Sequence, residues 1–118
     1  MNKKLFNYIA NSPTAYQACA HTADILKQSG FNEIRENEKW VLEENKGYFV
    51  KRNGSSLIAF KVPAGGFKGF MIAAAHSDSP CLKIKENAEM TDKYYVRLST
   101  ETYGGMIYSS WLDRALAV

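Results

Sequence analysis

A histidine and an aspartate two residues apart, His76 and Asp78, are the side chains of this sequence best suited to chemistry. Neutral imidazole is a good zinc ligand, and a carboxylate that accepts a hydrogen bond from the second ring nitrogen fixes its tautomer. Residues two apart on an extended segment point to the same side. The pair could therefore act as a metal ligand and its orienting group, or the two side chains could bind different ions.

The position of the pair favours a functional role. Residues 69–75 form an uncharged apolar run just before His76, which is typical of a short strand buried on both faces. Ligands of open α/β sheets gather at the carboxyl ends of strands. The alternative is an ordinary turn, in which Asp78 caps a nearby backbone N–H and Pro80 ends the strand.

The spacing of the other candidate ligands predicts no complete metal site. Zinc needs three or four protein ligands, and neither the two cysteines nor the scattered acidic residues show a convincing spacing to His76. His21 lies off the apolar stripe of its expected helix, so a solvent-facing or locally bonded histidine is expected there.

A serine nucleophile is an alternative with less support. Ser77 and Ser79 flank the aspartate, but neither lies in the Gly-x-Ser-x-Gly turn of serine hydrolases.

Composition restricts the class of protein. The chain has 118 residues, 46% of them hydrophobic, and a formal net charge of +3, which fits one small globular domain. Basic and acidic residues are interleaved, which argues against a nucleic-acid partner. Neither a secretory signal nor an apolar run near the ~20 residues of a membrane span is visible, so no membrane partner and a cytoplasmic location are expected. Cys19 and Cys81 are accordingly predicted to be free, buried thiols.

Two helices are expected at the start of the chain, over residues 3–11 and about 12–29. Ser12 is predicted to be the N-cap of the second helix, with Pro13 at its first helical position. The predicted buried stripe of this helix consists of Ala15, Cys19, Thr22, Ala23 and Leu26.

The remainder is expected to be β structure. Strands at 48–50 and 57–60 flank Asn53-Gly54, a strong hairpin signal, and residues 40–42 could form a short strand or edge. The buried strand at 69–75 follows, and then half-exposed strands at 82–85 and 94–98.

These elements predict an α/β fold with a domain boundary near Cys81, dividing residues 1–81 from residues 82–118. The two helices can cover only one face of such a sheet, and residues 111–118 resemble the middle of a fold. The chain is therefore expected to be a fragment. As an alternative to an enzyme segment, it could be a non-catalytic module that pairs its exposed β edges with another chain.

Four stretches carry a more specific signal: residues 12–16 (Ser-Pro-Thr-Ala-Tyr), residues 47–53 with Ser55 and Ser56, residues 74–83 (Ala-Ala-His-Ser-Asp-Ser-Pro-Cys-Leu-Lys), and residues 101–105 with 111–114. In this order they resemble motifs of the aspartyl aminopeptidase family of zinc metallopeptidases. The resemblance runs from about Phe6 to Val118. Two departures are Met106, where the family often has a third glycine, and Ala115, where an acidic residue is usual.

The resemblance implies an α/β/α catalytic domain with two zinc ions, into which a β-rich dimerisation domain is inserted after the first ligand motif. Residues 1–81 would be the N-terminal portion of the first domain, and residues 82–118 the beginning of the second. His76 would be one zinc ligand and Asp78 the residue that orients it. The remaining ligands would lie later in the family's chain, and Asp113 would be structural.

The activity implied by the resemblance is removal of N-terminal amino acids from peptides by metal-activated water. Peptide substrates and a homo-oligomer are implied with it, whereas the preferred N-terminal residue is left open. The isolated segment is predicted to be inactive, because one ligand cannot hold zinc against water.

Overall fold

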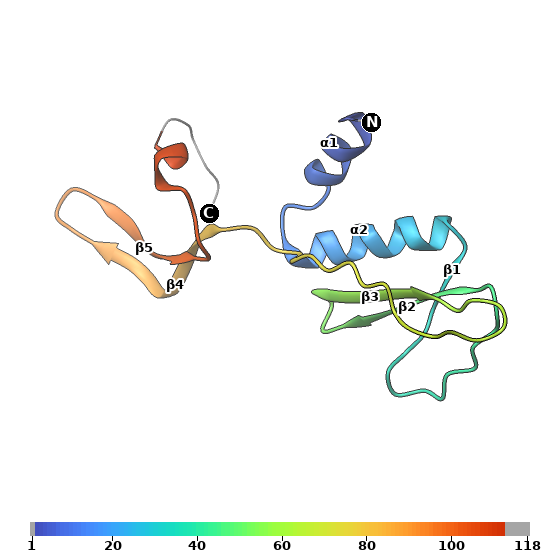
Figure 1. Ribbon diagram of the computed structural model, residues 1–118. Helices are drawn as coiled ribbons and strands as arrows, with labels where there is room; N and C mark the ends of the chain where they lie inside the picture. Colours follow the sequence, from blue (N-terminus) through green and yellow to red (C-terminus); the bar gives the residue numbers. More distant parts are fainter. Residues whose placement is uncertain (1, 113–118) are drawn as a thin grey trace. The chain divides into compact units, whose positions relative to one another are not determined.

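The computed structural model describes residues 2–112, so Asp113 and Ala115 lie outside the described residues. The chain divides between Asp78 and Ser79 into two units. The first contains two helices and a three-stranded sheet, and the second contains a two-stranded sheet (Figure 1). The predicted α/β class is confirmed, whereas the assignment of the units to a catalytic and a dimerisation domain stays a prediction.

Both predicted helices form, as α1 (Asn2–Ala10) and α2 (Ala15–Gln28), but the predicted cap of α2 is wrong. The N-cap is Thr14, which has extended backbone angles and a side-chain oxygen that accepts from the N–H of Gln17 at 3.4 Å. The Thr14 hydroxyl also donates to the Gln17 side chain at 2.8 Å. Thr14 caps the helix because its hydroxyl can both accept from the Gln17 N–H and donate to the Gln17 side chain. The buried Ser12 hydroxyl has no hydrogen-bond partner.

Replacing these two candidate caps tests the assignment. Thr14→Ala is expected to lower the free energy of unfolding by about 1 kcal/mol, because it leaves helix N–H groups unsatisfied. Ser12→Ala should change it by less than about 0.5 kcal/mol, since that hydroxyl makes no bond to lose. Urea denaturation of both variants measures the difference, and equal losses would contradict Thr14 as the cap.

The first sheet has the order β1-β2-β3, with β1 at Phe31–Glu33, β2 at Gly47–Arg52 and β3 at Ser56–Lys61. The predicted hairpin is confirmed, because β2 and β3 are antiparallel and join through Asn53, Gly54 and Ser55. Asn53 and Gly54 have φ values of 52° and 70°, so both central residues of the turn from Arg52 to Ser55 have left-handed backbone, and the N–H of Ser55 closes the turn on the carbonyl of Arg52 at 3.3 Å.

Strand β1 was not predicted, because its three residues carry no β pattern. It pairs in parallel with β2, where Phe31 lies opposite Gly47. A Cβ on Gly47 would lie 2.7 Å from the Phe31 ring, so only glycine allows this approach. The possible strand at residues 40–42 does not form; the Trp40 indole instead donates to the carbonyl of Arg35 at 2.8 Å.

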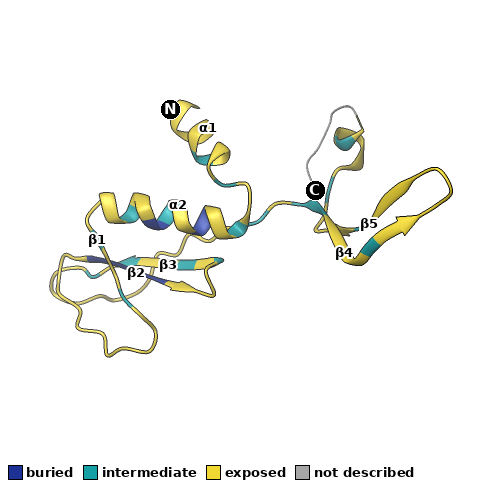
Figure 2. Cartoon of the chain, turned by 180° about the vertical axis from the view of Figure 1, so that it is seen from behind, coloured by how far each residue is buried: buried dark blue, intermediate teal, exposed yellow. Residues whose placement is uncertain are grey.

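Helix α2 lies along one face of this sheet, and the buried residues lie between them (Figure 2). Phe49, in the central strand, has 0% exposure. The predicted helix stripe is confirmed, with Cys19 and Ala23 buried and its other members half-buried. The buried hydrophobic residues of the described chain are Ala18, Cys19, Ala23, Tyr48, Phe49 and Val50.

An ion-pair cluster ties α2, β1 and β2 together. The Glu33 carboxylate pairs with Lys27 at 2.8 Å and with Lys51 at 2.9 Å. The hydrogen bond from Lys27, followed by that from Lys51, lowers the pKa of Glu33 below its usual value.

The predicted buried strand at residues 69–75 is wrong for this structure. These residues form no strand, and their apolar side chains are exposed, with Ile72 at 84%. A strand buried on both faces needs partner strands and a helical layer on each side. Within residues 2–112, α2 covers one face of the sheet and nothing covers residues 69–75. His76 therefore lies in the coil between β3 and β4, not at the tip of a strand.

The second unit contains β4 (Cys81–Thr91) and β5 (Val96–Tyr103), which pair antiparallel. Strand β4 includes the strand predicted at 82–85, whereas the strand predicted at 94–98 begins two residues later, at Val96, and runs on to Tyr103. The short 3-10 helix η1 follows at Tyr108–Trp111. Both cysteines are free, as predicted, although only Cys19 is buried and Cys81 is half-buried. No helix within residues 2–112 has the length and apolarity needed to cross a membrane.

Candidate metal centre

The imidazole of His76 and the carboxylate of Asp78 lie together, as their spacing predicted. The Nδ1 atom of His76 is 3.0 Å from Oδ1 of Asp78 and 2.8 Å from the Asp78 backbone carbonyl oxygen. The His76 side chain is 79% exposed and that of Asp78 is 39% exposed. The ring is therefore open to its surroundings while its Nδ1 atom is held by the loop itself.

This geometry assigns the ring proton. Both oxygens near Nδ1 are acceptors, so the Nδ1–H of His76 must be the donor to each of them. In the neutral ring the lone pair is then on Nε2. A histidine held in this way has the tautomer of a metal ligand whose second nitrogen is fixed by a carboxylate.

A small cavity of about 290 Å³ borders the His76 loop. Its lining includes hydroxyl groups of the two helices, of the hairpin end and of the His76 loop: Tyr8, Thr22, Ser55, Ser56 and Ser77. Tyr8 and Thr22 hydrogen-bond to each other at 2.9 Å across the two helices. The rest of the lining is apolar apart from His76 and the Cys19 thiol. Hydroxyls are thus the main polar groups beside His76, and they are poor zinc ligands compared with imidazole, thiolate or carboxylate.

Cys19, which also lines this cavity, is not a nucleophile. Burial raises the pKa of its thiol, and the nearby Lys51 only partly offsets that effect. The protonated thiol donates to the carbonyl of Ser56 at 3.4 Å. A reactive cysteine needs the opposite environment, one that lowers the thiol pKa.

The remaining candidates do not join His76. His21 is half-buried, and its ring centre lies 5.4 Å from that of Tyr8 on the other helix, so it makes a ring contact between helices rather than taking the solvent-facing or locally bonded position expected. The Ser77 hydroxyl donates a hydrogen bond to the backbone carbonyl of Ser55 at 2.9 Å. A backbone carbonyl cannot serve as the general base that would activate a serine nucleophile. This geometry gives the serine-nucleophile alternative no base.

Within residues 2–112, no group of three or more histidine, cysteine, aspartate or glutamate side chains could hold a metal ion. The residues therefore fit one zinc ligand and its orienting carboxylate but not a complete zinc site. Asp113, predicted to be structural, is outside the described residues.

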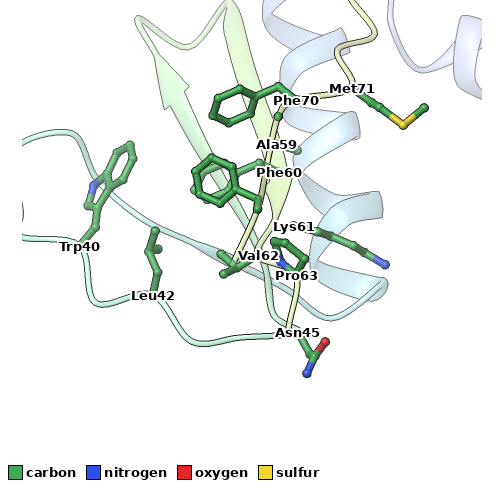
Figure 3. Close-up of a pocket in the computed structure, with 12 residues that line it drawn as sticks. Trp40, Leu42, Asn45, Ala59, Phe60, Lys61, Val62, Pro63, Phe70 and Met71 are labelled. Atoms are coloured by element: carbon green, nitrogen blue, oxygen red, sulfur yellow. The ribbon is translucent and has the colours of Figure 1, made fainter. Parts of the chain in front are cut away.

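A larger cavity of about 870 Å³ lies elsewhere in the first unit and is apolar (Figure 3). Its walls include Trp40 and Phe60, whose ring centres are 6.1 Å apart, and the exposed Phe70. In Figure 3 the side chains of Asn45 and Lys61 point away from these rings. The cavity therefore presents hydrophobic surface but no cluster of groups that could carry out acid, base or nucleophilic chemistry.

The hydrogen bond between Ser77 and Ser55 is a feature of this region that the sequence did not predict. Its acceptor is a backbone carbonyl in a turn 22 residues earlier, and such an acceptor leaves no mark in residue types.

Comparison with known proteins agrees with the motif evidence. A family described as aminopeptidase I zinc metalloprotease (M18) matches residues 8–118. A probable M18 family aminopeptidase 2 from Clostridium acetobutylicum is 46% identical over 119 residues, covering 98% of this chain and 28% of the relative. A probable aspartyl aminopeptidase from Ricinus communis is 38% identical over 122 residues, covering 100% of this chain and 24% of the relative. The chain thus spans about a quarter of the length of these curated relatives.

Solved structures agree as well. The cryo-EM structure of the Ape4 and Nbr1 complex contains a chain with 36% identity and a TM-score of 0.83, covering 92% of this chain and 21% of that one. The crystal structure of an M18 family aminopeptidase from Thermotoga maritima has 26% identity and a TM-score of 0.78, covering 95% of this chain and 24% of that one. This chain belongs to the M18 family of aminopeptidase I zinc metalloproteases.

Proposed function

We propose that this chain supplies one zinc-ligating histidine to an aminopeptidase that removes N-terminal residues from peptides. In this proposal Nε2 of His76 is the ligand atom and Asp78 fixes the ring. Polypeptide outside residues 2–112 supplies the remaining ligands of two zinc ions, because the described residues hold no group of three candidate ligands.

The observation that carries the proposal is the bond from Nδ1–H of His76 to Asp78. It leaves the lone pair of the neutral ring on Nε2 and prevents the ring from turning the wrong nitrogen toward a metal. An exposed histidine without a role would gain little from a hydrogen bond that fixes its tautomer.

Each residue of the pair has a defined task in this proposal. Zinc in such a site supplies Lewis acidity toward the scissile carbonyl and toward water. His76 would present its Nε2 to the metal with the ring proton kept on Nδ1, and the Asp78 carboxylate accepts the hydrogen bond of that Nδ1–H and so fixes the ring. The transfer of protons to the leaving amine is assigned to groups outside the described residues.

The second unit is proposed to begin a dimerisation domain. Its β4 and β5 strands pair only with each other among the described residues, and most of their side chains are exposed, which suits a surface that pairs further. A solved relative from S. cerevisiae is described as a dodecamer. We extend to this protein a homo-oligomeric assembly, peptide substrates and a cytoplasmic location as parts of the same proposal.

The proposal is tested by separating the chain from the rest of an M18 enzyme. The purified 118-residue chain is expected to release no amino acid from a panel of aminoacyl p-nitroanilides, aspartyl and glutamyl included, with or without added zinc. A chimera in which residues 1–118 replace the matching stretch of the Clostridium acetobutylicum relative should hydrolyse them, and a chelator should abolish that activity.

Two results would contradict the proposal. The first is metal-dependent turnover by the pure chain, which would show that the 118 residues hold a complete site. The second is a folded chimera that neither binds zinc nor cleaves, although the intact relative does both.

A further inference from the structure

The hydrogen bonds between His76 and Asp78 fix the ring relative to its own loop. Both residues lie in the coil that runs from the end of β3 at Lys61 to the start of β4 at Cys81. A metal site shared between distant parts of a chain requires each ligand to be held in place against the whole domain. Another contact must therefore anchor this loop.

Ser77, between the two residues, makes such a contact. Its hydroxyl donates to the backbone carbonyl of Ser55 at 2.9 Å, across 22 residues of sequence. The backbone bends at Ser77, where the His76 ring turns toward Asp78 and the Ser77 hydroxyl reaches the hairpin. The three residues thus combine the proposed ligand and its orienting group with a contact to the rest of the unit.

The acceptor belongs to a rigid part of the fold. Ser55 follows the left-handed pair Asn53 and Gly54 at the end of the β2–β3 hairpin, and its own N–H donates to the carbonyl of Arg52 at 3.3 Å. The next residue, Ser56, is held by α2, because the buried Cys19 thiol donates to its carbonyl at 3.4 Å. The end of the hairpin is therefore fixed both by its own turn and by the helix.

We propose that Ser77 is a positioning residue that anchors the His76–Asp78 loop to the β2–β3 hairpin through the Ser55 carbonyl. Its place in the enzyme rests on the proposed ligand role of His76, whereas the anchor itself is a property of this chain. The hydroxyl is the required group, so Ser77→Thr should keep the anchor. Ser77→Val should lose it, because valine has the shape of threonine without a hydrogen-bond donor.

The first test uses the complete 118-residue chain and ¹⁵N NMR relaxation. In the wild type and in Ser77→Thr, the backbone order parameters of residues 76–78 should be near the ~0.85 of rigid backbone. In Ser77→Val and Ser77→Ala they should fall below about 0.6, while the amides of β2 and β3 keep their wild-type values. Ser77→Ala repeats the test should the larger valine disturb the fold.

The second test measures whether the Ser77 anchor affects zinc binding. In the chimera with the Clostridium acetobutylicum relative, Ser77→Val should weaken zinc binding by about 10–100-fold, as loss of an outer hydrogen bond does at other metal sites, and Ser77→Thr should restore it. Competition with a chromogenic chelator measures the zinc affinity without reference to activity.

The two proposals fail in different ways. Equal order parameters and equal zinc affinities for Ser77→Val and Ser77→Thr would overturn the anchor, whatever His76 does. If His76→Ala leaves the zinc content unchanged while Ser77→Val mobilises the loop, the ligand role of His76 fails and the anchor stands.

Discussion

Replacing His76 with alanine in the chimera is expected to remove at least one zinc ion and nearly all aminopeptidase activity. The loss of zinc affinity should exceed the roughly 10–100-fold that removal of an outer hydrogen-bond partner causes, because the ligand atom itself is lost. Atomic absorption gives the zinc content, and initial rates on aminoacyl p-nitroanilides give kcat/KM.

The second histidine of the chain provides the matched control. His21 packs against Tyr8 on the helical side of the first unit, and it belongs to no candidate metal group among the described residues. His21→Ala should therefore keep both the zinc content and kcat/KM within about twofold of wild type, less than the smallest loss expected for an outer partner. Equal zinc contents in the two variants would rule out His76 as a ligand.

Phe49→Ala is expected to cost about 3–5 kcal/mol of unfolding free energy, the range for deleting a buried aromatic side chain. Phe49 has 0% exposure and is the largest fully buried side chain of the described residues. Few other residues are buried, so neighbouring groups cannot refill the cavity. Because single domains are stable by only about 5–15 kcal/mol, the cooperative transition of the first unit should move far down in urea or disappear.

Phe6→Ala is the control for Phe49→Ala. Phe6 lies on α1 with 65% of its surface exposed, and its loss should change the unfolding free energy by less than about 0.5 kcal/mol. Circular dichroism during urea titration follows both variants. A Phe49→Ala chain that unfolds cooperatively within 1 kcal/mol of wild type would show that the core lies elsewhere, since about 3 kcal/mol is the lower expectation.

Local features of this fold were predictable, and features that depend on distant contacts were not. Periodicity and the Asn53-Gly54 pair predicted the helices and the hairpin because each signal acts within a few residues. Strand β1 depends instead on the missing side chain at Gly47, which leaves room for the Phe31 ring, and no pattern in residues 31–33 reveals this. The cap at Thr14 was readable from its glutamine partner, but the adjacent Ser12-Pro13 offered a competing signal.

The candidate site divides in the same way. The two-residue spacing of His76 and Asp78 was enough to predict that their side chains meet, although the backbone between them bends at Ser77 and is not extended. The argument that placed them at a strand end was wrong for this structure, since an apolar run predicts burial only if its partners are present. The anchor at Ser77 could not be predicted, because its acceptor is a backbone atom.

The exposed apolar run before His76 has a consequence for handling the isolated chain. Residues 70–75 contain no charge, no proline and no glycine, and they form no strand within the fold. Six-residue segments of this kind stack between molecules into cross-β fibrils, in which every backbone group finds a partner in the next chain. Fibril growth is therefore an available fate for this segment at high protein concentration, until a covering partner occupies it.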